Sequence, residues 1–205
     1  MEIKEEIKEN GKKEEKDTNE TKSTQRALAF FGCSCSGKTT IIKHILSKYR
    51  EFVFSVSYTT RKMREGEKHG IDYFFVSKKE FEEKIKEGFF VEYTFFNENY
   101  YGTPKNQGDP RHIVIYDCDK KGIECFSSKL KNIKFVYVHA GEDEILDRLK
   151  QRKNITEEEI NARKKTMKES MEFAKNFKFD FIVETSKSIN LTLNEVDFII
   201  STYFL

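Results

Sequence analysis

The chain of 205 residues has no tryptophan, two prolines, four cysteines and four histidines. It has no apolar run near the roughly 18 residues that a membrane span requires. It opens with acidic residues where a secretory signal carries basic and apolar ones. Four cysteines are too few for a disulfide scaffold, and the scattered histidines lack a metal-ligand spacing. We therefore expect a cytoplasmic protein without a membrane segment or a structural zinc site.

Charge is abundant but balanced, with 37 basic and 35 acidic residues and a net charge of +2. This balance gives no indication of a nucleic-acid partner. The 19 phenylalanines and nine tyrosines provide ample apolar volume for a packed core. Residues 1–25 differ, because they are densely charged and contain no aromatic residue. We expect a disordered charged tail over residues 1–25 and one folded domain over residues 26–205.

From residue 26 onward, short apolar runs alternate with longer amphipathic stretches. The first run covers residues 27–31, and a helical pattern follows at residues 39–49. This alternation predicts an α/β fold with a parallel sheet flanked by helices. Further strands are expected at residues 52–56, 112–116, 133–138 and 179–183.

Two regions break the alternation and divide the core into residues 26–56, 104–141 and 177–205. Within residues 57–103, strand patterns at 72–76, 89–95 and 100–101 surround a helix that opens with the capping box Ser77–Glu80. This pattern predicts a small β-rich insertion. Residues 142–176 are predicted to be helical, with a capping box at Thr156–Glu159 and a basic side suited to a lid over phosphates. The apolar stripe of this lid comprises Ile160, Met167, Met171 and Ala174.

Residues 32–39 match the phosphate-loop pattern G-x-x-x-x-G-K-[ST], directly after a predicted strand and before a predicted helix. In such a loop the backbone N–H groups face the β-phosphate, Lys38 spans the β- and γ-phosphates, and the Thr39 hydroxyl coordinates Mg²⁺. Asp117 ends a later apolar strand and can orient Mg²⁺ through water. The residues expected at this nucleotide site are Gly32, Cys33, Ser34, Cys35, Ser36, Gly37, Lys38, Thr39 and Thr40.

Further blocks follow the phosphate loop in a fixed order. The stretch 54–67 places Arg61 and Arg64 three residues apart at the end of a strand, and it is followed by the blocks 70–75, 90–93 and 99–103. Together with the phosphate loop, these blocks resemble guanylate kinase over residues 26–205. The resemblance implies a P-loop nucleoside monophosphate kinase-like fold that transfers the γ-phosphoryl group of ATP to GMP with Mg²⁺. It also implies a GMP-binding insertion at 57–103, dGMP as an alternative acceptor, and a monomer or weak dimer.

The resemblance also implies roles for individual residues. A carboxylate at Glu92 can accept both N1–H and N2–H of guanine, and arginine forks suit a phosphate dianion. Each of these residues taken alone is more simply explained as a surface charge or as an aromatic residue of a sheet. Their occurrence together, in the order found in the family, is what favours a binding site. The GMP phosphate is expected at Ser57, Arg61, Arg64, Tyr73 and Tyr101, and guanine at Glu92 and Thr103 with Asp119 nearby. The catalytic cations are expected to be Lys38, Arg64, Arg152 and Arg163, with Arg148 and Glu184 on the ATP side.

The chain departs from the family pattern at several positions. Cys33 and Cys35 stand where the family usually has Pro and Gly, and Glu184 stands where it commonly has Asn. Thiols at a helix N-terminus tend toward a lowered pKa, so we hypothesise that Cys33 or Cys35 is sensitive to oxidation; the alternative is that both simply fill the loop. Residues 104–111 are expected to form a shortened, irregular connection.

Two other functions remain open at this point. One is a catalytically inactive guanylate-kinase-like interaction module, although such modules typically lack the complete phosphate loop and the lid arginines found here. The other is a P-loop kinase for a different nucleotide, which Glu92 and Thr103 speak against.

Overall fold

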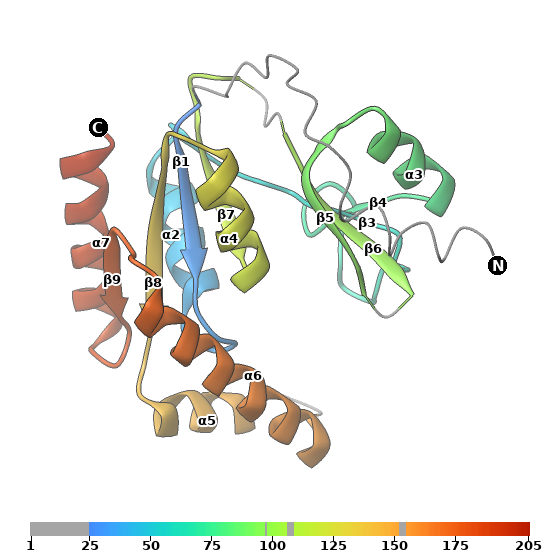
Figure 1. Ribbon diagram of the computed structural model, residues 1–205. Coiled ribbons are helices and arrows are strands. Elements are labelled where there is room, and N and C mark those ends of the chain that lie inside the picture. Colours follow the sequence, from blue (N-terminus) through green and yellow to red (C-terminus); the bar gives the residue numbers. More distant parts are fainter. Residues whose placement is uncertain (1–24, 97, 106–108, 152–154) are drawn as a thin grey trace.

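The computed structural model describes residues 25–96, 98–105, 109–151 and 155–205 (Figure 1). Its core is a five-stranded parallel sheet with the strand order β2-β7-β1-β8-β9. The predicted parallel α/β architecture is therefore confirmed. The strands are β1 (Ala27–Phe31), β2 (Phe52–Phe54), β7 (Ile113–Cys118), β8 (Ile133–His139) and β9 (Phe181–Glu184).

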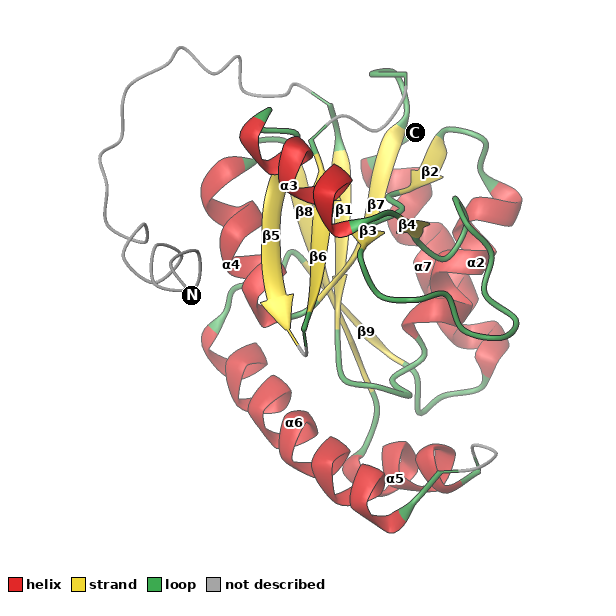
Figure 2. Ribbon diagram, turned by 90° about the vertical axis from the view of Figure 1, so that its right-hand side faces the viewer, coloured by secondary structure: helices red, strands yellow, loops and turns green. Residues whose placement is uncertain are grey.

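Helices cover both faces of this sheet (Figure 2). One face packs against α2 (Lys38–Lys48) and α7 (Ile189–Tyr203), and the other packs against α4 (Lys120–Lys129) and the end of α6 (Glu157–Asn176). All five residues of β1 are buried, and its side chains alternate between the two apolar clusters. Burial on both faces explains why the central strand reads as a continuous apolar run.

The insertion forms a second sheet with the order β4-β3-β6-β5. The helix α3 (Lys78–Lys86) lies on it, with Phe81 stacked on Phe90 and on Tyr100 at centroid distances of 4.4 and 5.1 Å. The predicted Ser77–Glu80 capping box is present. The strands are β3 (Tyr58–Thr59), β4 (Phe74–Phe75), β5 (Phe90–Phe96) and β6 (Asn99–Pro104).

The predicted lid consists of α5 (Glu142–Lys150) and α6, and the Thr156–Glu159 capping box opens α6 as expected. Met167 is buried against Ile145 of α5, whereas Ala174 packs on the core. Of the predicted residues, Arg152 and the tail over residues 1–24 lie outside the described part of the chain.

The connection between β6 and β7 is irregular in its described residues, as expected, with a turn at residues 110–111.

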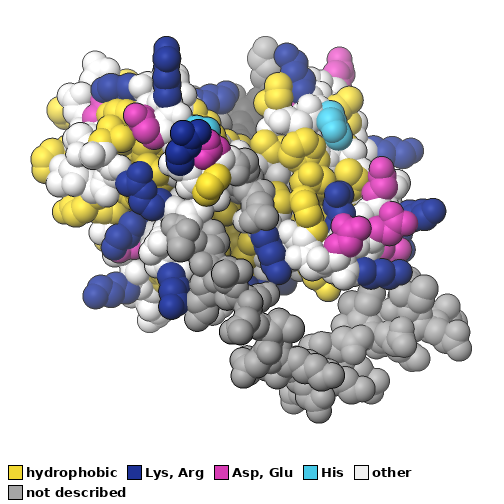
Figure 3. Space-filling view, turned by 90° about the horizontal axis from the view of Figure 1, so that it is seen from above, with side chains coloured by type: hydrophobic (Ala, Val, Ile, Leu, Met, Phe, Trp, Pro, Cys, Tyr) yellow, Lys and Arg dark blue, Asp and Glu magenta, His cyan; other side chains and the backbone are white. Residues whose placement is uncertain are grey.

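Figure 3 looks onto the end of the molecule at which β1 begins, where Lys and Arg side chains are interspersed with acidic ones. On the insertion, Tyr93 and Phe95 are about half exposed. No described helix is long and apolar enough to cross a membrane.

Candidate functional site

The phosphate loop joins the end of β1 to the start of α2. Two glycines have positive φ: 154° at Gly32, and 100° at Gly37, which precedes the helix. A Cβ atom on Gly32 would lie 2.2 Å from the carbonyl oxygen of Val138, so only glycine fits. The first turn of α2 has neither a capping side chain nor an acidic residue. The N–H groups of Lys38 and Thr39 at its start are therefore available to an anion.

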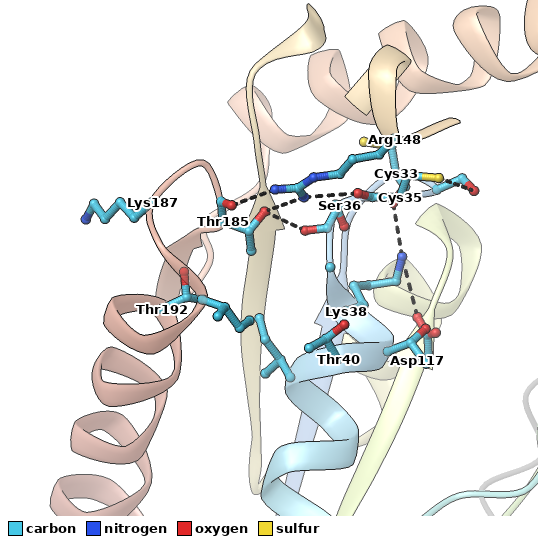
Figure 4. A pocket seen from close by; sticks show the side chains of 15 residues that line it. Cys33, Cys35, Ser36, Lys38, Thr40, Asp117, Arg148, Thr185, Lys187 and Thr192 are labelled. Atoms are coloured by element: carbon cyan, nitrogen blue, oxygen red, sulfur yellow. Dashed lines mark hydrogen bonds and ion pairs between the residues drawn. The ribbon is translucent and has the colours of Figure 1, made fainter. Parts of the chain in front are cut away.

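Lys38 is held across this loop. Its Nζ donates to the carbonyl oxygens of Gly32 and Cys33 at 2.6 and 3.3 Å, and lies 3.8 Å from Oδ1 of Asp117 (Figure 4). Desolvation raises the pKa of Asp117, and the Lys38 ammonium opposes that shift. The loop thus presents a cation and a carboxylate side by side.

A cavity of about 620 Å³ opens in front of the loop and includes the predicted Thr39, Thr40 and Arg148. Arg148 fixes one wall, since it donates to the carbonyl oxygens of Cys35 and Thr185 at 3.2 and 2.7 Å (Figure 4). It also pairs with Glu144 of its own helix. Five lining residues were not predicted: Ile41, Thr185, Lys187, Ile189 and Thr192.

Thr185 occupies the place that we had assigned to its neighbour. Its hydroxyl contacts the carbonyl oxygen of Ser36 at 2.8 Å, whereas Glu184 is not among the residues that line the cavity. Thr185 follows β9, and residues at the carboxyl ends of parallel strands commonly border a ligand site. That rule, which pointed to Asp117, could also have found Thr185.

A second cavity of about 610 Å³ lies between the insertion and the core. Glu92 on β5 is directly opposite Thr103 on β6, whose Oγ1 donates to Oε1 of Glu92 at 2.6 Å. Burial raises the pKa of Glu92, and the Thr103 hydrogen bond opposes that shift. Of the predicted GMP-binding residues, this cavity includes Ser57, Tyr73, Glu92, Tyr101, Thr103 and Asp119.

Asp119 is also the N-cap of α4, because its Oδ1 accepts a hydrogen bond from the Gly122 backbone N–H at 2.8 Å. This bond fixes the carboxylate at the edge of the cavity.

Arg61 and Arg64 are not among the residues that line this cavity. The Arg61 guanidinium donates to both oxygens of Glu67, at 3.0 and 2.7 Å, and its carbon lies 5.5 Å from the centroid of the Tyr73 ring. The backbone N–H of Arg64 donates to the same carboxylate at 2.7 Å, and its side chain is exposed. Arg61 therefore lies beside the Tyr73 wall, and Glu67 joins its guanidinium to the backbone of Arg64.

A third cavity of about 440 Å³ shares Lys38 and Asp117 with the first cavity, and Asp117 and Asp119 with the second. Arg163 of the lid also lines it and donates to Oγ of Ser34 on the phosphate loop at 2.8 Å. The structure thus brings a predicted lid arginine to the junction. The cavities form a path from the phosphate loop to the Glu92–Thr103 pair.

Of the two loop cysteines, Cys33 differs from the hypothesis. Cys33 is buried in an apolar cluster with Ile145 and Met167, and this burial raises its pKa, so the predicted lowering is wrong for Cys33. Cys35 packs against the same cluster and has a φ of 67°, a left-handed conformation that favours glycine. Cys35 therefore adopts the backbone of the glycine that it replaces.

Comparisons with known proteins agree with this geometry. The family model described as "Guanylate kinase" matches residues 24–203. A guanylate kinase of Mycoplasma genitalium is 34% identical over 195 residues, and the match covers 92% of this chain and 80% of the relative. One of Onion yellows phytoplasma is 38% identical over 177 residues, covering 80% and 79% of the two chains. The crystal structure of guanylate kinase from Anaplasma phagocytophilum matches in fold, with a TM-score of 0.64 at 22% identity, over 88% of this chain and 86% of that one.

Proposed function

The chain belongs to the guanylate kinase family, and from this premise we propose how its residues transfer the γ-phosphoryl group of ATP to GMP. The observation that carries the proposal is the path of adjoining cavities. It begins at the phosphate loop and ends at Glu92 and Thr103, with Asp117 lining all three cavities.

On the donor side, the free N–H groups of α2 bind the β-phosphate, and Lys38 reaches the β- and γ-phosphates. Lys38 then exchanges its bonds to the loop carbonyls for bonds to the triphosphate. Arg148 and Thr185 hold the opposite wall, where the adenosine moiety lies.

On the acceptor side, Glu92 accepts N1–H and N2–H of guanine, and Thr103 fixes its carboxylate. Adenine offers no such pair of donors and leaves the buried carboxylate unpaired. Asp119 borders the same end. The GMP phosphate lies toward Ser57, Tyr73 and Tyr101, and Arg61 and Arg64 turn toward it from the adjacent wall.

The transfer is an in-line displacement in which a phosphate oxygen of GMP attacks the γ-phosphorus and ADP leaves. Such a reaction needs positioning and charge neutralisation rather than a covalent intermediate. Lys38 and Arg163 already border the junction between the two sites, and we assign them this neutralisation together with Arg64 and Arg152. Lid closure excludes water, which would otherwise accept the phosphoryl group.

The residues present fit a magnesium ion. Asp117 and Thr39 both line the donor cavity with oxygen ligands of the kind that Mg²⁺ prefers. Within the described residues, no group of three or more His, Cys, Asp or Glu side chains forms a metal site. We therefore propose that Thr39 and Asp117 hold the ion together with the nucleotide's phosphates, where it supplies charge neutralisation.

The decisive experiment is an ADP-release assay with ATP, Mg²⁺ and one acceptor at a time: GMP, dGMP, AMP, CMP or UMP. We expect turnover with GMP and weaker turnover with dGMP. No turnover with GMP would refute the activity, and turnover with AMP in its place would refute the role of Glu92. The names of the relatives support the enzyme rather than an inactive interaction module.

We further propose that the enzyme works in the cytoplasm as a monomer or weak dimer. All four cysteines are free thiols, as is usual in a reducing compartment. Light scattering over a range of concentrations tests the oligomeric state, and a stable dimer would contradict it.

A further inference from the structure

One wall of the acceptor cavity has no role in the transfer described above. It is formed by the lid helix α6, which runs across the carboxyl end of the core sheet toward the side of the insertion (Figure 1). Thr166, Glu169 and Ser170 of this helix line the cavity. They are three polar side chains within five positions, on a helix whose next turn, at Phe173 and Ala174, packs into the core.

The bonding state of these three side chains differs. The Thr166 hydroxyl donates within its own helix, to the carbonyl oxygen of Ala162 at 3.0 Å. The side chains of Glu169 and Ser170 make no hydrogen bond or ion pair within the described parts of the chain. By contrast, Glu172 on the same helix pairs with Lys175 at 3.3 Å and lies outside the cavity. A carboxylate and a hydroxyl are thus left facing the acceptor.

The proposed function already assigns protein residues to the base and to the phosphate of that acceptor. Glu92 and Thr103 face the base, whereas Ser57, Tyr73 and Tyr101 face the phosphate. The ribose joins these two ends, and its 2′- and 3′-hydroxyls are adjacent donors. One carboxylate can accept from both, and a serine hydroxyl can donate or accept beside it.

We propose that Glu169 and Ser170 bind the ribose hydroxyls of the acceptor, so that the enzyme selects a ribonucleotide over its 2′-deoxy analogue. This inference rests on the proposed function and assigns the substrate class of the same site. Lys120 and Lys121 border the cavity from α4 and offset the negative charge that Glu169 brings near a phosphate.

The contact also affects catalysis, because α6 is a single rigid element. Arg163, Thr166 and Ser170 are spaced by three and four residues and lie on one helix face. Ser170 is seven residues beyond Arg163, or about 10.5 Å along the axis. Seating the ribose against Glu169 and Ser170 therefore fixes where Arg163 meets the phosphate loop. Loss of the 2′-hydroxyl is expected to lower kcat as well as to raise KM.

The test compares GMP with dGMP in the full-length wild type and in Glu169→Ala. In each, kcat and KM are measured together with the dissociation constant of each acceptor from calorimetry. We expect the wild type to prefer GMP by about tenfold or more in kcat/KM, as a hydrogen bond to a charged group implies. Glu169→Ala should lower kcat/KM for GMP toward the value for dGMP and leave kcat/KM for dGMP nearly unchanged. Ser170→Ala should act in the same direction but less.

Glu172→Ala is the matched control, since it removes a carboxylate from the same helix outside the cavity, and it should retain the wild-type preference. Equal use of GMP and dGMP by the wild type, or an equal loss for both in Glu169→Ala, overturns the inference. The dissociation constants of GMP and dGMP are measured without turnover, so they test the ribose contact separately from the proposed kinase activity. A protein that binds GMP more tightly than dGMP through Glu169 without turning either over would refute the kinase and support the ribose contact.

Discussion

The hydroxyl of Thr103 donates to Oε1 of Glu92 at 2.6 Å, across two directly opposed residues of β5 and β6. The bond orients the carboxylate of Glu92 within the cavity, where it can meet a planar ligand. A pair held by strand register keeps its geometry without the ligand, so little reorganisation is needed when guanine binds.

Glu92→Gln should weaken GMP binding by about a hundredfold or more, because the amide turns a donor toward the N1–H or N2–H of guanine. ATP affinity should not change. Calorimetric titration of each nucleotide measures both. The exposed Glu83 on α3 provides the control, and Glu83→Gln should behave as wild type. An equal loss of ATP and GMP affinity would contradict the assignment.

Recognition of GMP should fail in acid at a higher pH than an ordinary glutamate predicts. Burial raises the pKa of Glu92. As the pH falls through that raised value, the carboxylate gains a proton and can no longer accept both guanine donors. The GMP phosphate itself titrates near pH ~6, so the profile of Glu92→Gln is the reference. Identical profiles of GMP affinity in the two proteins would show that Glu92 does not titrate there.

Lys38→Met should abolish catalysis while preserving the fold. The methionine keeps much of the aliphatic stem but removes the ammonium that meets the transferring phosphoryl group, and we expect kcat to fall by about a thousandfold. Lys43→Met changes an exposed lysine of the same helix and should leave kcat unaltered. Steady-state kinetics and thermal melting of both variants provide the comparison. Substantial activity in Lys38→Met would remove Lys38 from the mechanism.

Glu67→Gln should raise KM for GMP by about tenfold, because it weakens the bonds that hold Arg61 and the Arg64 backbone. KM for ATP should stay constant, since no contact of Glu67 reaches the donor cavity. Glu65→Gln, at an exposed position of the same loop, is the control. A fall in kcat with KM unchanged would place Glu67 in the chemical step instead.

Replacing Cys35 by alanine and by glycine separates its backbone from its side chain. Both remove the thiol, but only glycine adopts a φ of 67° without the cost of about 1–2 kcal/mol that a left-handed conformation imposes. Cys35→Gly should therefore be more stable than Cys35→Ala, opposite to their order in a helix. Denaturant unfolding of the two variants measures the difference. Equal stability would mean that the loop relaxes around residue 35.

The parts of this protein that the sequence predicts are those fixed by neighbours along the chain. The phosphate loop is contiguous from Gly32 to Thr39, and both capping boxes join residues three positions apart. β1 is apolar throughout because both of its faces are buried. Local pattern was therefore enough to locate the donor site and most of the sheet.

What the sequence leaves open depends on distant partners. β3 has only two residues and exists through its pairing with β4 and β6, so no strand was expected at Tyr58–Thr59. The strand expected at residues 52–56 ends at Phe54. Thr185 contacts a loop 149 residues away. The pKa of Cys33 is set by burial beneath Ile145 and Met167, which opposes the effect expected at a helix N-terminus. Packing over such separations leaves no periodic pattern in the sequence.

The place at which the insertion leaves the core has a consequence for how the protein could change in evolution. β2 and β7 are adjacent and parallel, and residues 57–103 occupy most of the chain between them. Parallel neighbours need a long crossover, which is usually a helix, and here the insertion that we propose to bind the acceptor takes that helix's place. The segment could be exchanged for another without altering the order of the core strands. Acceptor preference can therefore diverge separately from the donor chemistry.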